Sequence, residues 1–160
     1  MSPTSAEHMP ESSSPGPRLP DPAFRRAFTD VVWEREVGYC RALRAGDRVF
    51  VTGTAPVDGS GEVIAPGNAY EQAKACFEAI RSALAQLDVG LDRVMRTRMF
   101  VTDIDRWAEY GRAHREAFGA HPPTTTMVEV RRLIHPDMLI EIEADAVAEN
   151  AAEPATPTRS

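Results

Sequence analysis

Cysteine is scarce in this chain of 160 residues, which contains only Cys40 and Cys76. Two thiols are too few for the dense disulfide framework of a small secreted domain, so we expect reduced thiols and a cytoplasmic protein. Cys40 has no histidine nearby in the sequence and belongs to no Cys-x-x-Cys motif, which argues against a catalytic thiol. The four histidines show neither His-x-His nor His-Glu-x-x-His spacing. The sequence therefore predicts no metal site.

Long apolar runs and clustered positive charge are absent as well. No run of about eighteen apolar residues exists that could span a membrane. The N-terminal residues lack the basic and then apolar pattern of a secretory signal, so none is expected. Lys74 is the only lysine and the formal net charge is −6, whereas phosphate binding requires a cationic surface, so nucleic acid is not an expected partner. No phosphate loop or dinucleotide-binding fingerprint is present, and no cofactor is predicted.

The middle of the chain has the composition of one folded domain. Apolar residues make up 42% of the chain, which is enough for a sizeable core at this length. Residues 1–22 are rich in proline and serine, residues 149–160 resemble them, and neither segment shows a hydrophobic period. Both are predicted to be disordered, because they cannot bury enough apolar surface to offset chain entropy. Residues 31–148 are predicted to form a single domain.

Hydrophobic patterns divide this domain into strands and two helices. The first helix is predicted to begin after Asn68, which can cap its N-terminus, and to end at Gly90. The second helix is predicted to be capped by Asp103 or Asp105 and closed by Gly119. The predicted strands are 31–43, 47–54, 62–64, 93–102, 127–134 and 138–147, the last two joined by a turn at 135–137.

The last predicted strand alternates apolar and acidic residues. This alternation places Ile140, Ile142, Ala144 and Ala146 on one face and Glu141, Glu143 and Asp145 on the other. The order of elements predicts an α+β domain, a mixed six-stranded sheet with two helices on one face. Because helices cover only one face, the other face needs cover, and oligomerisation is expected.

Several short motifs, in order along nearly the whole domain, resemble the Rid (YjgF-like) family of reactive-intermediate imine deaminases. The motifs are Gly38-Tyr39-Cys40-Arg41-Ala42, Val51-Thr52-Gly53-Thr54-Ala55-Pro56, Gln72, Phe100-Val101-Thr102-Asp103-Ile104, Val128-Glu129-Val130 and Glu141-Ile142-Glu143-Ala144. Each motif alone is weak, but their shared order favours the family and its fold. The resemblance implies a chorismate-mutase-like Rid fold and a homotrimer, with clefts for a small-molecule metabolite between neighbouring subunits.

The resemblance also nominates residues for the cleft. Glu141 matches the family's first glutamate of Glu-Ile-Glu, and Tyr39 matches its early tyrosine, so these two are the expected catalytic residues. A carboxylate near the reacting carbon can position and activate water. The expected substrate-binding residues carried over from the family are Thr52, Gly53, Thr125 and Met127. The resemblance implies neither a metal nor a cofactor.

One departure from the family stands at Thr125. Family members with deaminase activity carry the arginine of a Pro-Ala-Arg segment there, and it grips the substrate carboxylate bidentately, as threonine cannot. Free 2-aminoacrylate is therefore a poor candidate substrate. Arg98 is the first candidate to replace that arginine, because it lies mid-strand beside apolar residues where a charge needs a partner, and Arg41 beside Tyr39 is the second. The asparagine that most deaminases carry in the second helix is replaced by Gly111.

A structural role remains open for the acidic residues of the last strand. Glu141, Glu143 and Asp145 also fit cross-strand ion pairs with Arg96, Arg98 or Arg131, each contributing under about 1 kcal/mol when exposed.

The sequence thus predicts a Rid-like homotrimer that hydrolyses an imine or enamine, acting on a small carbonyl-type or imine metabolite. The alternative is a non-catalytic small-molecule-binding or regulatory trimer that retains the cleft without the reaction. A ribonuclease, an older label for some relatives, is disfavoured by the acidic charge and by the absence of a catalytic histidine pair.

Overall fold

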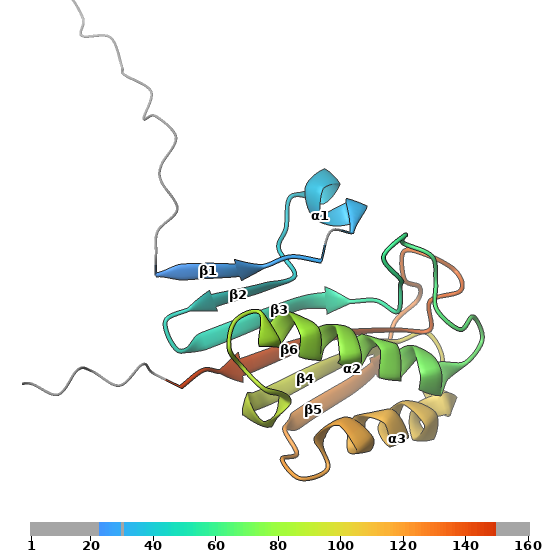
Figure 1. Cartoon of the computed structure of the whole chain (residues 1–160). Helices are drawn as coiled ribbons and strands as arrows, with labels where there is room; N and C mark the ends of the chain where they lie inside the picture. The colour runs from blue at the N-terminus through green and yellow to red at the C-terminus, as the bar shows by residue number, and fades with distance from the viewer. Residues whose placement is uncertain (1–22, 30, 150–160) are drawn as a thin grey trace, which may run out of the picture.

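The computed structural model describes residues 23–29 and 31–149, which form a mixed six-stranded sheet with helices on one face (Figure 1). The strands are β1 (Phe24–Ala27), β2 (Ala42–Ala45), β3 (Arg48–Thr54), β4 (Val94–Val101), β5 (Thr124–Glu129) and β6 (Ile140–Val147). Their spatial order is β1-β2-β3-β6-β4-β5, in which only β4 and β5 run parallel.

The helices are α1 (Val32–Val37), α2 (Ala69–Ala85) and α3 (Trp107–Phe118). In Figure 1, α2 and α3 lie across the same face of the sheet, while α1 stands at one end between β1 and β2 in the chain. The predicted fold class is therefore confirmed, with α1 as an additional short helix. None of the helices in the described part of the chain is both long and apolar enough to traverse a lipid bilayer.

The core lies between the sheet and the two helices α2 and α3. The apolar face of β6 is buried as its alternation predicts, whereas its acidic residues are only half-buried. On α2, the Asn68 side chain accepts a hydrogen bond from the N–H of Glu71 at 3.1 Å, which confirms the predicted N-cap. The helix ends at Ala85, before the predicted stop at Gly90, because Asp88 adopts a left-handed conformation with φ 59°.

The prediction of a strand over residues 31–43 is wrong. Val32–Val37 forms α1, which ends at Gly38 in the left-handed conformation that glycine favours (φ 82°). The sheet gains β1 instead, which pairs with β2. The sheet thus begins before Val31, where the domain was predicted to start.

The C-terminal prediction is also corrected. The strand predicted over 127–134 is β5 and ends at Glu129, and a loop over residues 130–139 leads to β6. The two strands are not neighbours, since β4 lies between them. Residues 62–64 form no strand of the sheet, only an isolated bridge between Val57 and Val63. The predicted disorder of 1–22 and 149–160 lies outside the described residues, apart from Glu149.

Candidate functional site

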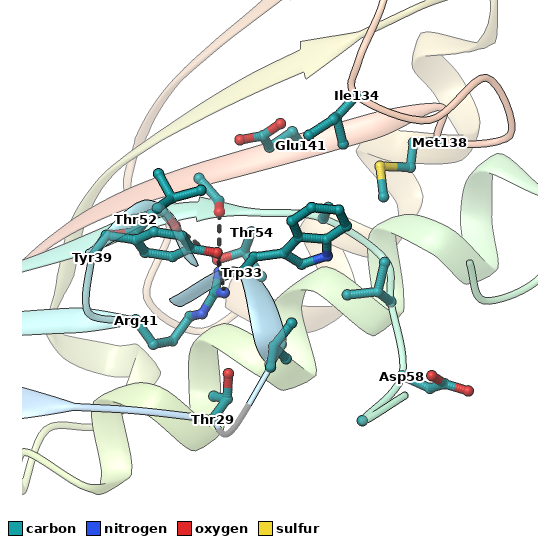
Figure 2. Close-up of a pocket in the computed structure, with 17 residues that line it drawn as sticks. Thr29, Trp33, Tyr39, Arg41, Thr52, Thr54, Asp58, Ile134, Met138 and Glu141 are labelled. Atoms are coloured by element: carbon teal, nitrogen blue, oxygen red, sulfur yellow. Dashed lines mark hydrogen bonds between the residues drawn. The ribbon is translucent and has the colours of Figure 1, made fainter. Parts of the chain in front are cut away.

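A cavity of about 410 Å³ opens beside the end of β3. Its walls come from α1, the loop after β3, the loop before β6, and β6 itself (Figure 2). Its volume lies within the range of small-molecule sites. Its polar and aromatic wall includes Trp33, Tyr39, Arg41, Thr52, Gly53 and Glu141.

Arg41 is buried and held by three protein acceptors. Its Nε donates to Glu34 Oε1 at 3.2 Å, and its terminal nitrogens donate to the Gly53 carbonyl at 3.1 Å and to the Tyr39 hydroxyl at 3.2 Å. Glu34 is also buried and accepts hydrogen bonds from the N–H and hydroxyl of Thr29 at 3.0 and 2.6 Å. The ion pair is therefore neutral as a unit, and it fixes α1 against the start of β2.

A β-bulge shapes the end of β3. Val51 pairs with Ala144 and Thr54 with Ile142, so β3 carries one more residue than β6 between these pairs. Both Val51 and Thr54 are buried, although strict alternation would place residues three apart on opposite faces. The bulge thus includes Gly53, beside the pocket, and bulges at such places re-aim neighbouring side chains.

Glu141 lies next to this bulge with its carboxylate over Gly53, where a Cβ would collide with Glu141 Oε1. Within the described ranges, no hydrogen bond or ion pair holds this carboxylate. Burial raises the pKa of Glu141 above its usual value, the charge of Glu143 raises it further, and Arg41 lowers it. A carboxylate in this state can take up and return a proton, as general acid–base catalysis requires.

We expect Gly53→Ala to displace the Glu141 carboxylate and to lower activity by up to about 100-fold, the effect of a misplacement of roughly 1 Å. The fold should survive, at a cost of about 1 kcal/mol, because the colliding atom ends a flexible side chain. Gly90→Ala is the matched control, since its Cβ would collide with the Asp92 carboxylate away from the pocket. Steady-state kinetics and thermal unfolding of both variants check this, and equal activity losses would contradict it.

Gln72 ties α2 to the loop that precedes β6. Its side-chain amide donates to the Asp137 carbonyl at 2.7 Å and accepts from the Leu139 N–H at 2.8 Å. This loop supplies Ile134 and Met138 to the pocket wall. The glutamine in the sequence motif is therefore buried and positions one side of the pocket.

The apolar wall of the pocket was not predicted from the sequence. Trp33 and Val37 come from α1, which was predicted as a strand, and Ile134 and Met138 come from the loop before β6. The available signal was Gly38 directly after a possible helical turn, because glycine commonly ends helices.

The pocket brings together the predicted residues Tyr39, Thr52, Gly53 and Glu141. It also contains Arg41, the second candidate to replace the family arginine. Thr125, Met127 and Arg98 do not line it.

Thr125 lies on β5, at the edge of the sheet. Its hydroxyl accepts a hydrogen bond from Thr97 at 2.8 Å, and Thr97 lies 3.0 Å from Nε2 of His114 on α3. Burial lowers the pKa of His114. Met127 packs against the core. Thr125 is thus exposed at the sheet edge, whereas Met127 is half-buried.

Arg98 lies on the sheet face without helices and pairs with Glu143 at 3.6 Å and Asp145 at 3.0 Å. The structural role considered for the acidic residues therefore applies to Glu143 and Asp145. Glu141 takes no part in these pairs. Nowhere in the described ranges do three or more histidine, cysteine or acidic side chains form a group that could hold a metal ion.

Comparison with known proteins identifies the family of the chain. The family model for endoribonuclease L-PSP matches residues 33–148. An uncharacterized Streptomyces coelicolor protein, SCO2049, is 36% identical over 124 residues, which cover 78% of this chain and 92% of that protein.

Solved structures show the same fold. The crystal structure of Rv2704 from Mycobacterium tuberculosis, a member of the YjgF/YER057c/UK114 family, is 40% identical with a TM-score of 0.71, covering 78% of this chain and 99% of that one. The structure of Escherichia coli TdcF with bound serine is 28% identical with a TM-score of 0.63, covering 69% and 88%. The chain therefore belongs to the endoribonuclease L-PSP family, the YjgF/UK114 or Rid family that its motifs indicated.

Proposed function

We propose that the protein hydrolyses the C=N bond of a small imine in this pocket and releases ammonia and a carbonyl compound. The observation that carries the proposal is the Glu141 carboxylate, which lies at a largely apolar cavity, has a raised pKa and has no partner among the described residues. Structural carboxylates usually have such partners, whereas catalytic ones face the substrate.

The reaction consumes one water molecule. Water adds to the imine carbon while Glu141 accepts one of its protons, and Glu141 then passes this proton to the nitrogen, which yields a carbinolamine and regenerates the carboxylate. The hydroxyl proton then passes by way of Glu141 to the nitrogen as the C–N bond breaks, so that ammonia leaves and the oxygen becomes the carbonyl. The Tyr39 hydroxyl accepts from Arg41 and retains its own proton for a hydrogen bond to the substrate.

The active form proposed here is a homotrimer. The sheet face opposite α2 and α3 exposes Phe50 (46%) and Val128 (43%), and β5 is an edge strand. Exposed apolar side chains on a sheet face and an unpaired edge strand both favour association with another copy. A small-molecule ligand is in keeping with the serine bound to TdcF.

A non-catalytic binding trimer is the second candidate. It is favoured by Thr125, which takes part in hydrogen bonds with Thr97 and offers no cation where deaminases carry arginine. Ribonuclease activity is not proposed, because no histidine lines the pocket and its arginine is already paired with Glu34.

The test is ammonia release from freshly generated 2-iminopropanoate, 2-iminobutanoate and an imine without a carboxylate, each compared with its spontaneous rate. Acceleration of any of these supports the proposal. If only the Thr125→Arg variant accelerates ammonia release from the two imino acids, the chain is a deaminase scaffold with altered specificity. Spontaneous rates throughout, with folded protein, would favour the binding module.

The pH dependence of kcat/KM should show an acidic limb at higher pH than an ordinary glutamate (pKa about 4.3) would give. Burial and the charge of Glu143 raise the pKa of Glu141, whereas Arg41 opposes them. The ionised base is present above the folded-state pKa and is lost as the pH falls through it, so activity should fall in that window. An unchanged acidic limb in Glu141→Gln would contradict this assignment.

A further inference from the structure

The charged side chains around the pocket differ in whether a protein partner compensates their charge. Arg41 and Glu34 form a 3.2 Å ion pair between two buried side chains, so neither adds net charge. Asp58 accepts hydrogen bonds from the N–H and hydroxyl of Ser60 at 2.9 and 2.6 Å, which lower its pKa. Glu141 has no partner in the described part of the chain. The lining therefore presents negative charge and holds no uncommitted cation.

The remaining wall is apolar and incompletely covered. Trp33 and Val37 on α1 are 38% and 72% exposed, and Ile134 across the pocket is 76% exposed. Met138 also lines the pocket (Figure 2). An indole, a thioether and aliphatic side chains around one cavity favour a flat or branched apolar group.

Arg132 is another arginine that could bind a substrate carboxylate. It borders a second, more open hollow together with Ile134 and Glu141. Within the described residues, neither an ion pair nor a hydrogen bond fixes its side chain. Arg132 is also exposed on the loop before β6. It therefore provides no fixed clamp for a carboxylate beside Glu141.

We propose that the pocket selects a protonated imine that carries an apolar substituent and no carboxylate. Glu141 faces the cationic nitrogen, and the apolar group packs against Trp33 and Val37. An ionised carboxylate is a strong partner for an N–H cation, and partial burial strengthens this interaction. A substrate carboxylate at the same place would meet Glu141 and the exposed Asp58 without a compensating cation. The identity of the reaction rests on the proposed function, whereas the charge preference in binding stands independently of it.

Three ligands of nearly equal shape test this preference: benzamidine, benzamide and benzoate, which carry charges of +1, 0 and −1. Isothermal titration calorimetry with the full chain should place benzamidine first, about tenfold or more tighter than benzamide, a difference expected of one charge-assisted hydrogen bond. Benzoate should bind most weakly. Glu141→Gln should bring benzamidine to the level of benzamide, and Arg132→Gln should leave the order unchanged.

Tightest binding of benzoate would overturn the inference, most clearly if Arg132→Gln abolished it. Failure of all three ligands to bind, or a benzamidine preference that survives in Glu141→Gln, would overturn it as well. The result is separable from catalysis. A benzamidine preference without imine hydrolysis would support this inference and refute the proposed reaction. Hydrolysis of imino acids together with a benzoate preference would support the proposed reaction and refute this inference.

Discussion

Glu141→Gln is expected to lower the rate of imine hydrolysis by about 100-fold or more, the contribution typical of a positioned general acid–base. Glutamine has nearly the same shape and can still form hydrogen bonds, but it cannot take up the proton from water. Affinity for a neutral ligand such as benzamide should change little, because the pocket walls remain in place. Kinetics and calorimetry on the same preparation separate the two effects.

The same substitution should not weaken the fold. A folded-state pKa above the unfolded value means that ionised Glu141 is disfavoured in the native protein, so it costs stability above the unfolded-state pKa. That cost diminishes as the pH falls from the folded-state pKa of Glu141 to its unfolded-state pKa. Glu141→Gln should therefore unfold at the same or a higher temperature at pH 7. A loss of activity accompanied by a loss of folding would count against a catalytic role.

Arg41→Ala is expected to destabilise the protein by about 3–5 kcal/mol, the usual cost of leaving one partner of a buried ion pair alone. Arg41 is 6% exposed and Glu34 5% exposed. Removing the guanidinium strands a buried carboxylate and frees the Gly53 carbonyl and the Tyr39 hydroxyl of their donor. Chemical denaturation with a constant m-value measures the change.

Arg25→Ala serves as the control for that prediction. Arg25 pairs with Asp88 at 2.7 Å, but the two side chains are 46% and 73% exposed. Such a pair contributes about 1 kcal/mol or less. The double variant Arg41→Ala/Glu34→Gln should recover part of the lost stability, since no buried charge then remains unpaired. Equal effects of Arg25→Ala and Arg41→Ala would show that the buried pair does not anchor α1.

The sheet could be predicted because its signals are local. The alternation along β6 requires only that one face be buried, and the structure buries the predicted residues. The cap at Asn68 is likewise a local hydrogen bond. The parallel pairing of β5 with β4, with β6 inserted beside β3, could not be read in the same way, because strand order depends on long-range packing.

The pocket wall was less predictable because α1 is held by side-chain contacts with residues outside the helix. A helix of six residues is marginal in isolation. Its sequence, with valines and a tryptophan, favours a strand by propensity. The contacts of Glu34 with Arg41 and Thr29 oppose that propensity, and both partners lie outside the helix, where helical or strand periodicity does not reveal them.

Local sequence patterns also did not reveal which arginine, Arg98 or Arg41, lies at the pocket. Alternation along β4 places Arg98 beside the acidic face of β6, where Glu143 and Asp145 engage it. Arg41 reaches the pocket because it lies just before β2, next to the bulge at Gly53. A bulge adds one residue to a strand, and no simple sequence period reveals it.

The most direct test of the account is a crystal structure of the protein with benzamidine. We predict an amidinium nitrogen about 2.7–2.9 Å from the Glu141 carboxylate, the range of charge-assisted hydrogen bonds, with the ring against Trp33. Two results would contradict the claim that this carboxylate faces the reacting nitrogen. Benzamidine could bind elsewhere on the protein, or Glu141 could point away from the pocket and form an ion pair with another side chain of the oligomer.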